Sequence, residues 1–175
     1  MREIIENILE KYELVLIKVD DVSSLPISYR TVYMCKFGCD QYGKYPSCPP
    51  NTGTPEEIRA FWDSYKKFIL VTTKYTWDAL SFDEYKRKFQ ISLINIQKEL
   101  LTKGWFYAFA LFPGSCRLCK ECGMPSLCYR PSDVRPAVSG MGVNMMLYLQ
   151  RLKNELALLN IPLHIERLFS IILLE

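Results

Sequence analysis

Several features that would indicate a familiar functional class are scarce in this sequence. Its 175 residues include a single histidine, His164, a net charge of only +3 and no run of five or more like charges. The mild charge gives no indication of binding to nucleic acid or to an anionic membrane. A lone histidine in an apolar context is more often a packed residue than a metal ligand, and no acid–base constellation for catalysis is recognisable.

Membrane and secretion signals are also missing from the sequence. No apolar stretch is long enough to cross a bilayer, and the first segment, MREIIENILEKYELV, is amphipathic and lacks a small-residue cleavage site. We therefore expect a cytoplasmic protein with no membrane partner. In a reducing compartment, closely spaced cysteines are more often metal ligands or redox groups than disulfides, and an odd total of seven resists complete pairing.

The hydrophobic pattern predicts an α/β fold in a single metal-binding domain that spans residues 1–175. Hydrophobic residues make up 49% of the chain, which is enough to bury a sizeable core. Helical spacing and capping residues predict helices at 2–11, 54–64, 81–104 and 142–159. Short apolar runs predict strands at 13–19, 29–34, 68–75, 105–112 and 163–174. Strands that alternate with long helices favour a layered fold, with helices flanking a mostly buried mixed sheet.

The strongest chemical signal lies in the cysteine loop at residues 113–136. Cys116, Cys119 and Cys122 are three residues apart, and Cys128 follows after six more. A chain wrapped this closely can present three thiolates to three corners of one polynuclear cluster. A single zinc ion more often takes its ligands from two separated pairs. The first three cysteines also match the start of the bacterial ferredoxin pattern, so the loop favours an iron–sulfur cluster over zinc.

The fourth cysteine of this loop departs from the ferredoxin pattern, because five residues rather than three precede Cys128. In that pattern the fourth cysteine ligates the other cluster. A longer spacer lets Cys128 either close its own cluster or reach a second one. We favour closure, so that Cys116, Cys119, Cys122 and Cys128 bind one [4Fe-4S] cluster.

A second, weaker cysteine group lies in the loop at residues 35–53, where Cys35, Cys39 and Cys48 stand among glycines and prolines. Glycine and proline at these positions prevent the regular hydrogen bonding of helices and sheets, so other interactions must hold the loop in place. Three packed free cysteines are one interpretation. In the other, three thiolates bind a second [4Fe-4S] cluster and leave one iron open. An open iron can act as a Lewis acid on a small-molecule or anionic ligand.

Two further features lie close to the cysteines in the sequence. Arg117, Arg130 and Arg135 are expected to balance the negative charge of a thiolate-ligated cluster rather than to bind a substrate. The turn at 139–142 contains two glycines and could approach a phosphate or a cluster, although two glycines alone are weak evidence.

Several stretches together resemble a known family. They are YGKYPSCPPNTGTPEE at 42–57, CRLCKECG at 116–123, Arg135-Pro136 and GMGVNM at 140–145. Over nearly the whole chain the sequence resembles the prokaryotic predicted metal-binding proteins grouped as domain of unknown function 2284. The resemblance implies metal or iron–sulfur binding in a cytoplasmic, largely anaerobic setting. It supplies no catalytic residues, because the family has no established reaction.

The sequence therefore leaves three functional hypotheses. The first is an iron–sulfur protein with two [4Fe-4S] clusters that performs reductive or sulfur chemistry on a small molecule at the open iron. The second is a non-catalytic electron-transfer or cluster-carrier protein that acts with a redox partner protein. The third is a structural protein with zinc at both sites. Whether the protein is an enzyme stays open. The lack of a fourth upstream cysteine favours catalysis at an open iron, whereas the lack of a recognisable acid–base constellation argues against an enzyme.

Overall fold

The computed structural model describes residues 1–77, 81–161 and 167–175. The described helices are α1 (Arg2–Lys11), the short 3-10 helix η1 (Val22–Ser24), α2 (Tyr29–Gly38), α3 (Pro55–Asp63), α4 (Phe82–Thr102), α5 (Met145–Arg151) and α6 (Lys153–Leu158). The described strands are β1 (Leu14–Asp21), β2 (Lys67–Thr73), β3 (Phe109–Ala110) and β4 (Phe169–Leu173). None of the described helices combines the length and the apolar character needed to cross a membrane.

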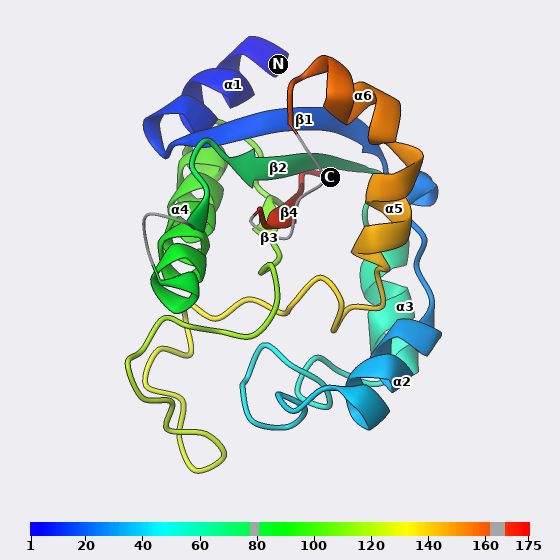
Figure 1. The fold of residues 1–175 in the computed structure, drawn as a ribbon, viewed down its shortest axis with the longest axis vertical. Helices are drawn as coiled ribbons and strands as arrows, with labels where there is room; N and C mark the ends of the chain where they lie inside the picture. Colours follow the sequence, from blue (N-terminus) through cyan, green and yellow to red (C-terminus); the bar gives the residue numbers. More distant parts are fainter. Residues whose placement is uncertain (78–80, 162–166) are drawn as a thin grey trace.

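The four strands form one sheet in the order β1-β2-β4-β3 (Figure 1). Every pairing between these strands is antiparallel, where a mixed sheet was expected. Each long connection brings the chain back so that the next strand runs antiparallel to its neighbour in the sheet. The segment between β1 and β2, for example, leaves at Asp21 and returns at its pairing partner Lys67.

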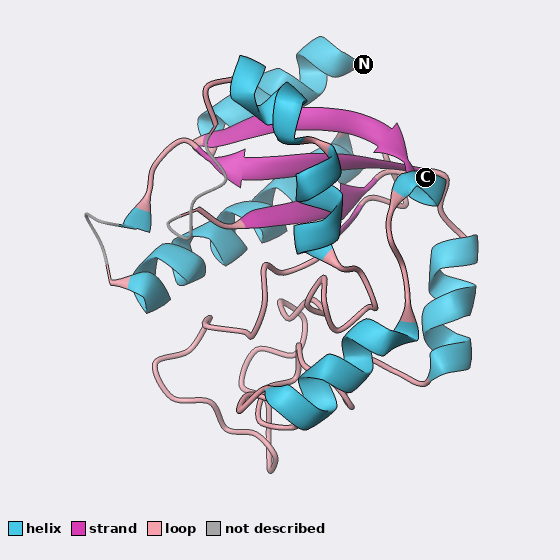
Figure 2. Cartoon of the chain, turned by 45° about the vertical axis from the view of Figure 1, so that its right-hand side comes forward, coloured by secondary structure: helices cyan, strands magenta, loops and turns pink. Residues whose placement is uncertain are grey.

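The sheet is buried on both faces, which confirms the predicted α/β layered fold. Successive strand residues point to opposite faces, so Phe68 and Leu70 of β2 join one core cluster while Ile69 and Val71 join the other. The first cluster packs the sheet against α3, α5 and α6. The second packs it against α1 and α4. Figures 1 and 2 show the sheet between these two sets of helices.

The expected strand at 29–34 is wrong, because this segment lies in helix α2. Ser28 caps the helix, and its side-chain oxygen accepts a hydrogen bond from the Arg30 backbone N–H. Val32 is the one buried residue of α2, while Tyr33 and Phe37 stack on the exposed side. The residues that suggested a strand therefore lie on a helix, with Val32 turned to the core and Tyr33 exposed, instead of lining a sheet.

Two other elements are shorter than expected. Only Phe109 and Ala110 of the predicted strand at 105–112 pair in the sheet, because the preceding residues form a turn in which the Ala108 N–H donates to the Trp105 carbonyl. The predicted helix at 142–159 begins later, where Asn144 caps α5, and it breaks at Leu152 into α5 and α6.

The last predicted segment, 163–174, is confirmed only in part. Its firm portion is strand β4, whose five residues are all buried. Residues 162–166, which include His164, lie outside the described part of the chain.

Both cysteine-bearing segments extend from the β3 side of the sheet (Figures 1 and 2). The loop at 113–136 is closed at its base, where the Phe112 N–H donates to the Pro136 carbonyl and the Val138 N–H donates to the Phe112 carbonyl. The Ala137 N–H in turn donates to the Ser47 carbonyl at 2.8 Å. Segments far apart in the sequence thus meet beside the sheet.

A buried hydrogen bond between α5 and β1 gives a pH-dependent prediction. Burial by itself raises the pKa of the Asp20 carboxyl. The Tyr148 hydroxyl donates to this carboxylate at 2.8 Å. This hydrogen bond, further hydrogen bonds and the charge of Lys18 outweigh burial, so the pKa is lower than its usual value. A lowered pKa means that this stabilisation is present above the unfolded value of about 3.9 and is lost as the pH falls below it. We expect Tyr148→Phe to lower the free energy of unfolding by about 1 kcal/mol at pH 7, with a smaller difference at pH 3.

Urea denaturation at both pH values measures this effect. Tyr107→Phe, at a residue that is 75% exposed, is the matched control and should change stability at neither pH. A Tyr148→Phe effect of equal size at pH 7 and pH 3 would show that the Asp20 carboxylate is not involved.

Candidate metal centre

The four downstream cysteines line a single cavity. Cys116, Cys119, Cys122 and Cys128 all face a space of about 100 Å³, several times the volume that one water molecule needs. Cys116 is buried, Cys119 and Cys128 are half-buried, and Cys122 is exposed. The group therefore extends from the protein interior to the surface.

A tight turn brings Cys128 back to this cavity. The Leu127 N–H donates to the Gly123 carbonyl at 3.0 Å, which folds the spacer that separates Cys122 from Cys128. A Cβ atom at Gly123 would lie only 2.1 Å from the Leu127 carbonyl oxygen, so no other residue fits without moving the backbone. The five-residue spacer thus allows Cys128 to face the other three cysteines of its own loop.

The three upstream cysteines are grouped on the other side of Ser47. Cys35 lies on α2, Cys39 caps the end of that helix, and Cys48 is buried in the following loop. Cys48 is close enough to the other two for their charges to raise the pKa of its thiol. The Ser28 N–H, at the start of α2, donates to the Gly142 carbonyl at 2.8 Å, so the turn at 139–142 lies beside this helix, and the Ser139 hydroxyl lowers the pKa of Cys35.

Burial governs the protonation of the innermost thiols. It is the largest cause that raises the pKa of Cys35 and of Cys48, and it raises the pKa of Cys116 to about 11. These thiols therefore carry their protons at neutral pH when no cation is near. Because thiolates are the ligand form, a metal bound here would displace protons from them.

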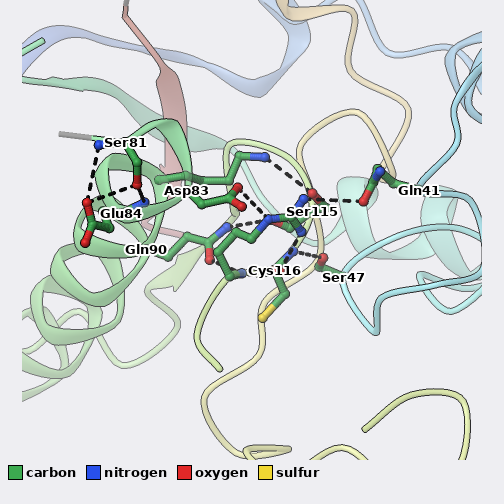
Figure 3. A network of polar contacts seen from close by, with 10 residues as sticks. Gln41, Ser47, Ser81, Asp83, Glu84, Gln90, Ser115 and Cys116 are labelled. Atoms are coloured by element: carbon green, nitrogen blue, oxygen red, sulfur yellow. Dashed lines mark hydrogen bonds and ion pairs between the residues drawn. The ribbon is translucent and has the colours of Figure 1, made fainter. Parts of the chain in front are cut away.

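Ser47 joins the two cysteine groups directly, and Figure 3 shows its contact with Cys116. Its side chain is fully buried, its oxygen accepts a hydrogen bond from the Cys116 N–H at 2.7 Å, and it lies 3.8 Å from the Cys48 sulfur. The upstream loop also lies close to Gly140, which follows the downstream loop. The Gly140 carbonyl accepts a hydrogen bond from the Thr52 hydroxyl, and a Cβ atom at Gly140 would lie 3.2 Å from Pro49. The two loops therefore form one connected unit.

Removal of the Ser47 hydroxyl should weaken this unit. In Ser47→Ala the buried Cys116 N–H loses its partner, and we expect the free energy of unfolding to fall by about 1–3 kcal/mol. Chemical denaturation under anaerobic conditions measures the change. Ser23→Ala, at an exposed serine, is the control. A Ser47→Ala variant as stable as this control would mean that the two loops are held together by other contacts.

Helix α4 fixes the start of the downstream loop through two buried polar residues. Gln90 donates to the Ser115 carbonyl at 2.9 Å and accepts from the Arg117 N–H at 2.8 Å (Figure 3). Lys86, one turn earlier, donates to the Ser115 hydroxyl at 3.3 Å. Its ammonium lies near enough to Cys48 and Cys39 for their charges to act on it, although burial lowers its pKa most strongly.

Sequence reasoning missed Ser47, Lys86, Gln90 and Ser115. A signal for two of them was present, because Lys86 and Gln90 are four residues apart and directly follow Tyr85 and Phe89 of the predicted apolar stripe. Buried polar residues at that spacing indicate a polar contact made by the helix. Nothing local marks Ser47, whose partner is 69 residues away in the sequence.

The three arginines near the downstream loop are each held by protein groups. Arg117 bonds to Asp83 at 2.8 Å and stacks on the Tyr45 ring. Arg130 pairs with Asp133, and Arg135 donates to Gln97 at 2.8 Å. Arg117 and Arg130 line the four-cysteine cavity, whereas Arg135 is not part of its lining. Two of the three cations thus lie where they could balance thiolate charge.

The described structure contains no preformed site for a single metal ion. Within the described residues, which include all seven cysteines, no three Cys, His, Asp or Glu side chains converge closely enough to hold one metal ion. The four downstream cysteines instead share the cavity of about 100 Å³ described above.

Comparison with known proteins gives a family. The family model described as "Predicted metal-binding protein (DUF2284)" matches residues 17–174. The chain belongs to this family. The match includes both cysteine loops and confirms the resemblance in the motifs around Cys48 and Cys116. Searches of curated proteins and of solved structures found no significant match.

Proposed function

We propose that this DUF2284 protein binds two [4Fe-4S] clusters, one closed by Cys116, Cys119, Cys122 and Cys128 and one held by the other three cysteines with an open iron. The observation that carries the proposal is the cavity shared by the four downstream cysteines. It is supported by the separate upstream group, Cys35, Cys39 and Cys48, on the far side of Ser47.

The sequence spacing of the downstream cysteines favours a cluster over zinc, because Cys116, Cys119 and Cys122 can present three thiolates to one compact group. Four thiolates around one tetrahedral zinc ion, at about 2.3 Å each, would place the sulfurs about 3.8 Å apart. In a polynuclear cluster each thiolate binds a different iron, so the sulfurs stand farther apart around a larger space. The four-cysteine cavity agrees with this second arrangement.

The surrounding residues suit an open upstream site. A cluster with an incompletely ligated iron supplies one-electron chemistry and a Lewis acid for a small-molecule ligand. The Ser139 hydroxyl would donate to the Cys35 thiolate, and the Lys86 ammonium would offset the negative charge at Cys48. Burial of Cys48 keeps water from that side of the site. We infer reductive or sulfur chemistry on a small molecule as the activity.

Electron transfer with a partner protein is the second candidate. It is favoured by the exposure of Cys122, which brings one edge of the four-cysteine group to the surface. If the protein is an enzyme, the four-cysteine cluster would receive electrons at this surface near Cys122 and pass them to the upstream site. The two functions therefore differ only in whether the upstream iron binds a ligand.

Metal and sulfide analysis of anaerobically purified protein tests the cluster proposal. We expect iron and acid-labile sulfide in equal amounts, about eight of each per chain for two [4Fe-4S] clusters. Stoichiometric zinc without sulfide would contradict the proposal and favour the structural zinc hypothesis. About four irons per chain would mean that only one cysteine group binds a cluster.

A further inference from the structure

A second and larger cavity lies next to the upstream cysteine group. It has a volume of about 450 Å³ and is bounded by α5, the start of β4 and the turn at Pro113–Gly114. Its wall is mainly apolar and includes Val138, Met145, Met146, Leu149, Leu168 and Phe169. Pockets for small molecules are of about this size, 300–1,000 Å³, and are apolar with a few placed polar groups.

Two walls of this cavity are shared with the upstream cysteine group. Ser139 lines the cavity, and the same turn is held to the start of α2, the helix that carries Cys35, where the Ser28 N–H donates to the Gly142 carbonyl at 2.8 Å. Gly114 lines it from another side, and a Cβ atom there would lie 3.5 Å from the Lys86 ammonium nitrogen. Two residues beyond Gly114, the Cys116 N–H donates to the Ser47 hydroxyl, which lies 3.8 Å from the Cys48 sulfur. A molecule in the cavity would thus lie beside the segments that carry Cys35 and Cys48.

The polar side chains of the cavity are one hydroxyl, Ser139, and one cation, Arg167. Arg167 is the one charged residue in the described lining. Its Nη1 donates to the Thr73 carbonyl, whereas its Nε is buried and has no hydrogen-bond partner among the residues that the structure describes. Because Nε is buried, a molecule in the cavity would contact the half-buried Arg167 through the rest of its guanidinium, and a carboxylate is the group that pairs with a guanidinium best.

We propose that this cavity binds the substrate of the upstream site, and that the substrate is a small carboxylic acid with an apolar body. Its carboxylate pairs with Arg167, and its apolar body packs on Met145 and Met146, whose flexible side chains adapt to varied shapes. The end of the molecule beside Ser139 faces the cysteine group. The assignment of the cavity to a substrate rests on the proposed function, whereas binding of the acid does not.

Calorimetric titration of the full-length, anaerobically purified protein with 4-phenylbutyrate and with the neutral 4-phenylbutyramide tests this inference. We expect the acid to bind about tenfold or more tightly than the amide, which corresponds to one charge-assisted hydrogen bond. Arg167→Gln should remove this preference. Met146→Trp, at an exposed residue of the cavity wall, should weaken both ligands, whereas Met34→Trp, at an exposed residue of α2, should weaken neither.

Each other outcome contradicts a specific part of the inference. Equal affinity for acid and amide in the unmodified protein would overturn the role of Arg167. No binding of either ligand at about 1 mM would overturn the cavity as a site for this class of molecule. Iron and sulfide analysis of the same sample separates the two proposals. A protein that contains both clusters but does not bind the acid would contradict only this inference. A protein that binds the acid but contains no iron would contradict only the cluster proposal.

Discussion

Replacement of Cys128 by alanine should lower the iron and acid-labile sulfide of the purified protein to about half. Cys128 lines the same cavity as Cys116, Cys119 and Cys122, and the Gly123–Leu127 turn directs it there. Without this thiolate one iron of the downstream cluster is left to solvent beside the exposed Cys122, whereas the buried Cys48 shields the upstream site. The upstream cluster keeps all three of its cysteines, so about four irons per chain should stay bound.

Ser126→Ala is the matched control, because Ser126 is exposed in the same spacer. This variant should retain the full iron and sulfide content. The Cys116→Ala/Cys128→Ala double variant should also keep about four irons per chain, because both changes affect the downstream cluster only. The result that would contradict our assignment is loss of all iron from this double variant. That outcome would show that Cys128 crosses to the other group, as the fourth cysteine of the ferredoxin pattern does.

The second large effect is expected for Gln90→Met. Gln90 is fully buried and provides partners for both the Ser115 carbonyl and the Arg117 N–H. Methionine has a similar length and cannot replace these hydrogen bonds, so two backbone groups on either side of Cys116 lose their partner. At about 1–3 kcal/mol for each group, the free energy of unfolding should fall by about 2–6 kcal/mol.

Denaturation of the anaerobic protein measures this loss, and the rate of iron release on addition of a chelator should rise with it. Gln150→Met, at an exposed position of α5, is the control and should change stability by less than about 0.5 kcal/mol. If Gln90→Met were as stable as this control, the start of the downstream loop would not depend on α4.

Local signals explain which elements could be predicted from the sequence. Helices α3 and α4 begin with capping boxes, Thr54 with Glu57 and Ser81 with Glu84, and these operate within one helical turn. Strand β2 is a short apolar run whose alternate residues fill opposite cores. Helix α2 was missed because its aromatic and β-branched residues are typical of strands, whereas the Ser28 cap and the exposure of Tyr33 and Phe37 decide its structure.

The candidate site was predictable only as far as its cysteines. The spacing of Cys116, Cys119 and Cys122 follows from the chemistry of a single loop, so the sequence alone indicates it. Contacts between distant segments leave no such pattern. The hydrogen bond from the Cys116 N–H to Ser47 and the cavity beside Ser139 depend on tertiary packing, which places α5 and the turn at 139–142 next to α2.

The central claim is that the upstream cysteines hold a cluster with an iron that is open to ligands. Electron paramagnetic resonance of the reduced protein, titrated with cyanide and with a small thiol, tests this claim most directly. We predict that one part of the spectrum shifts on addition of either ligand while the part from the four-cysteine cluster stays unchanged. A spectrum from both clusters that no ligand alters would contradict the open site and favour a pure electron carrier.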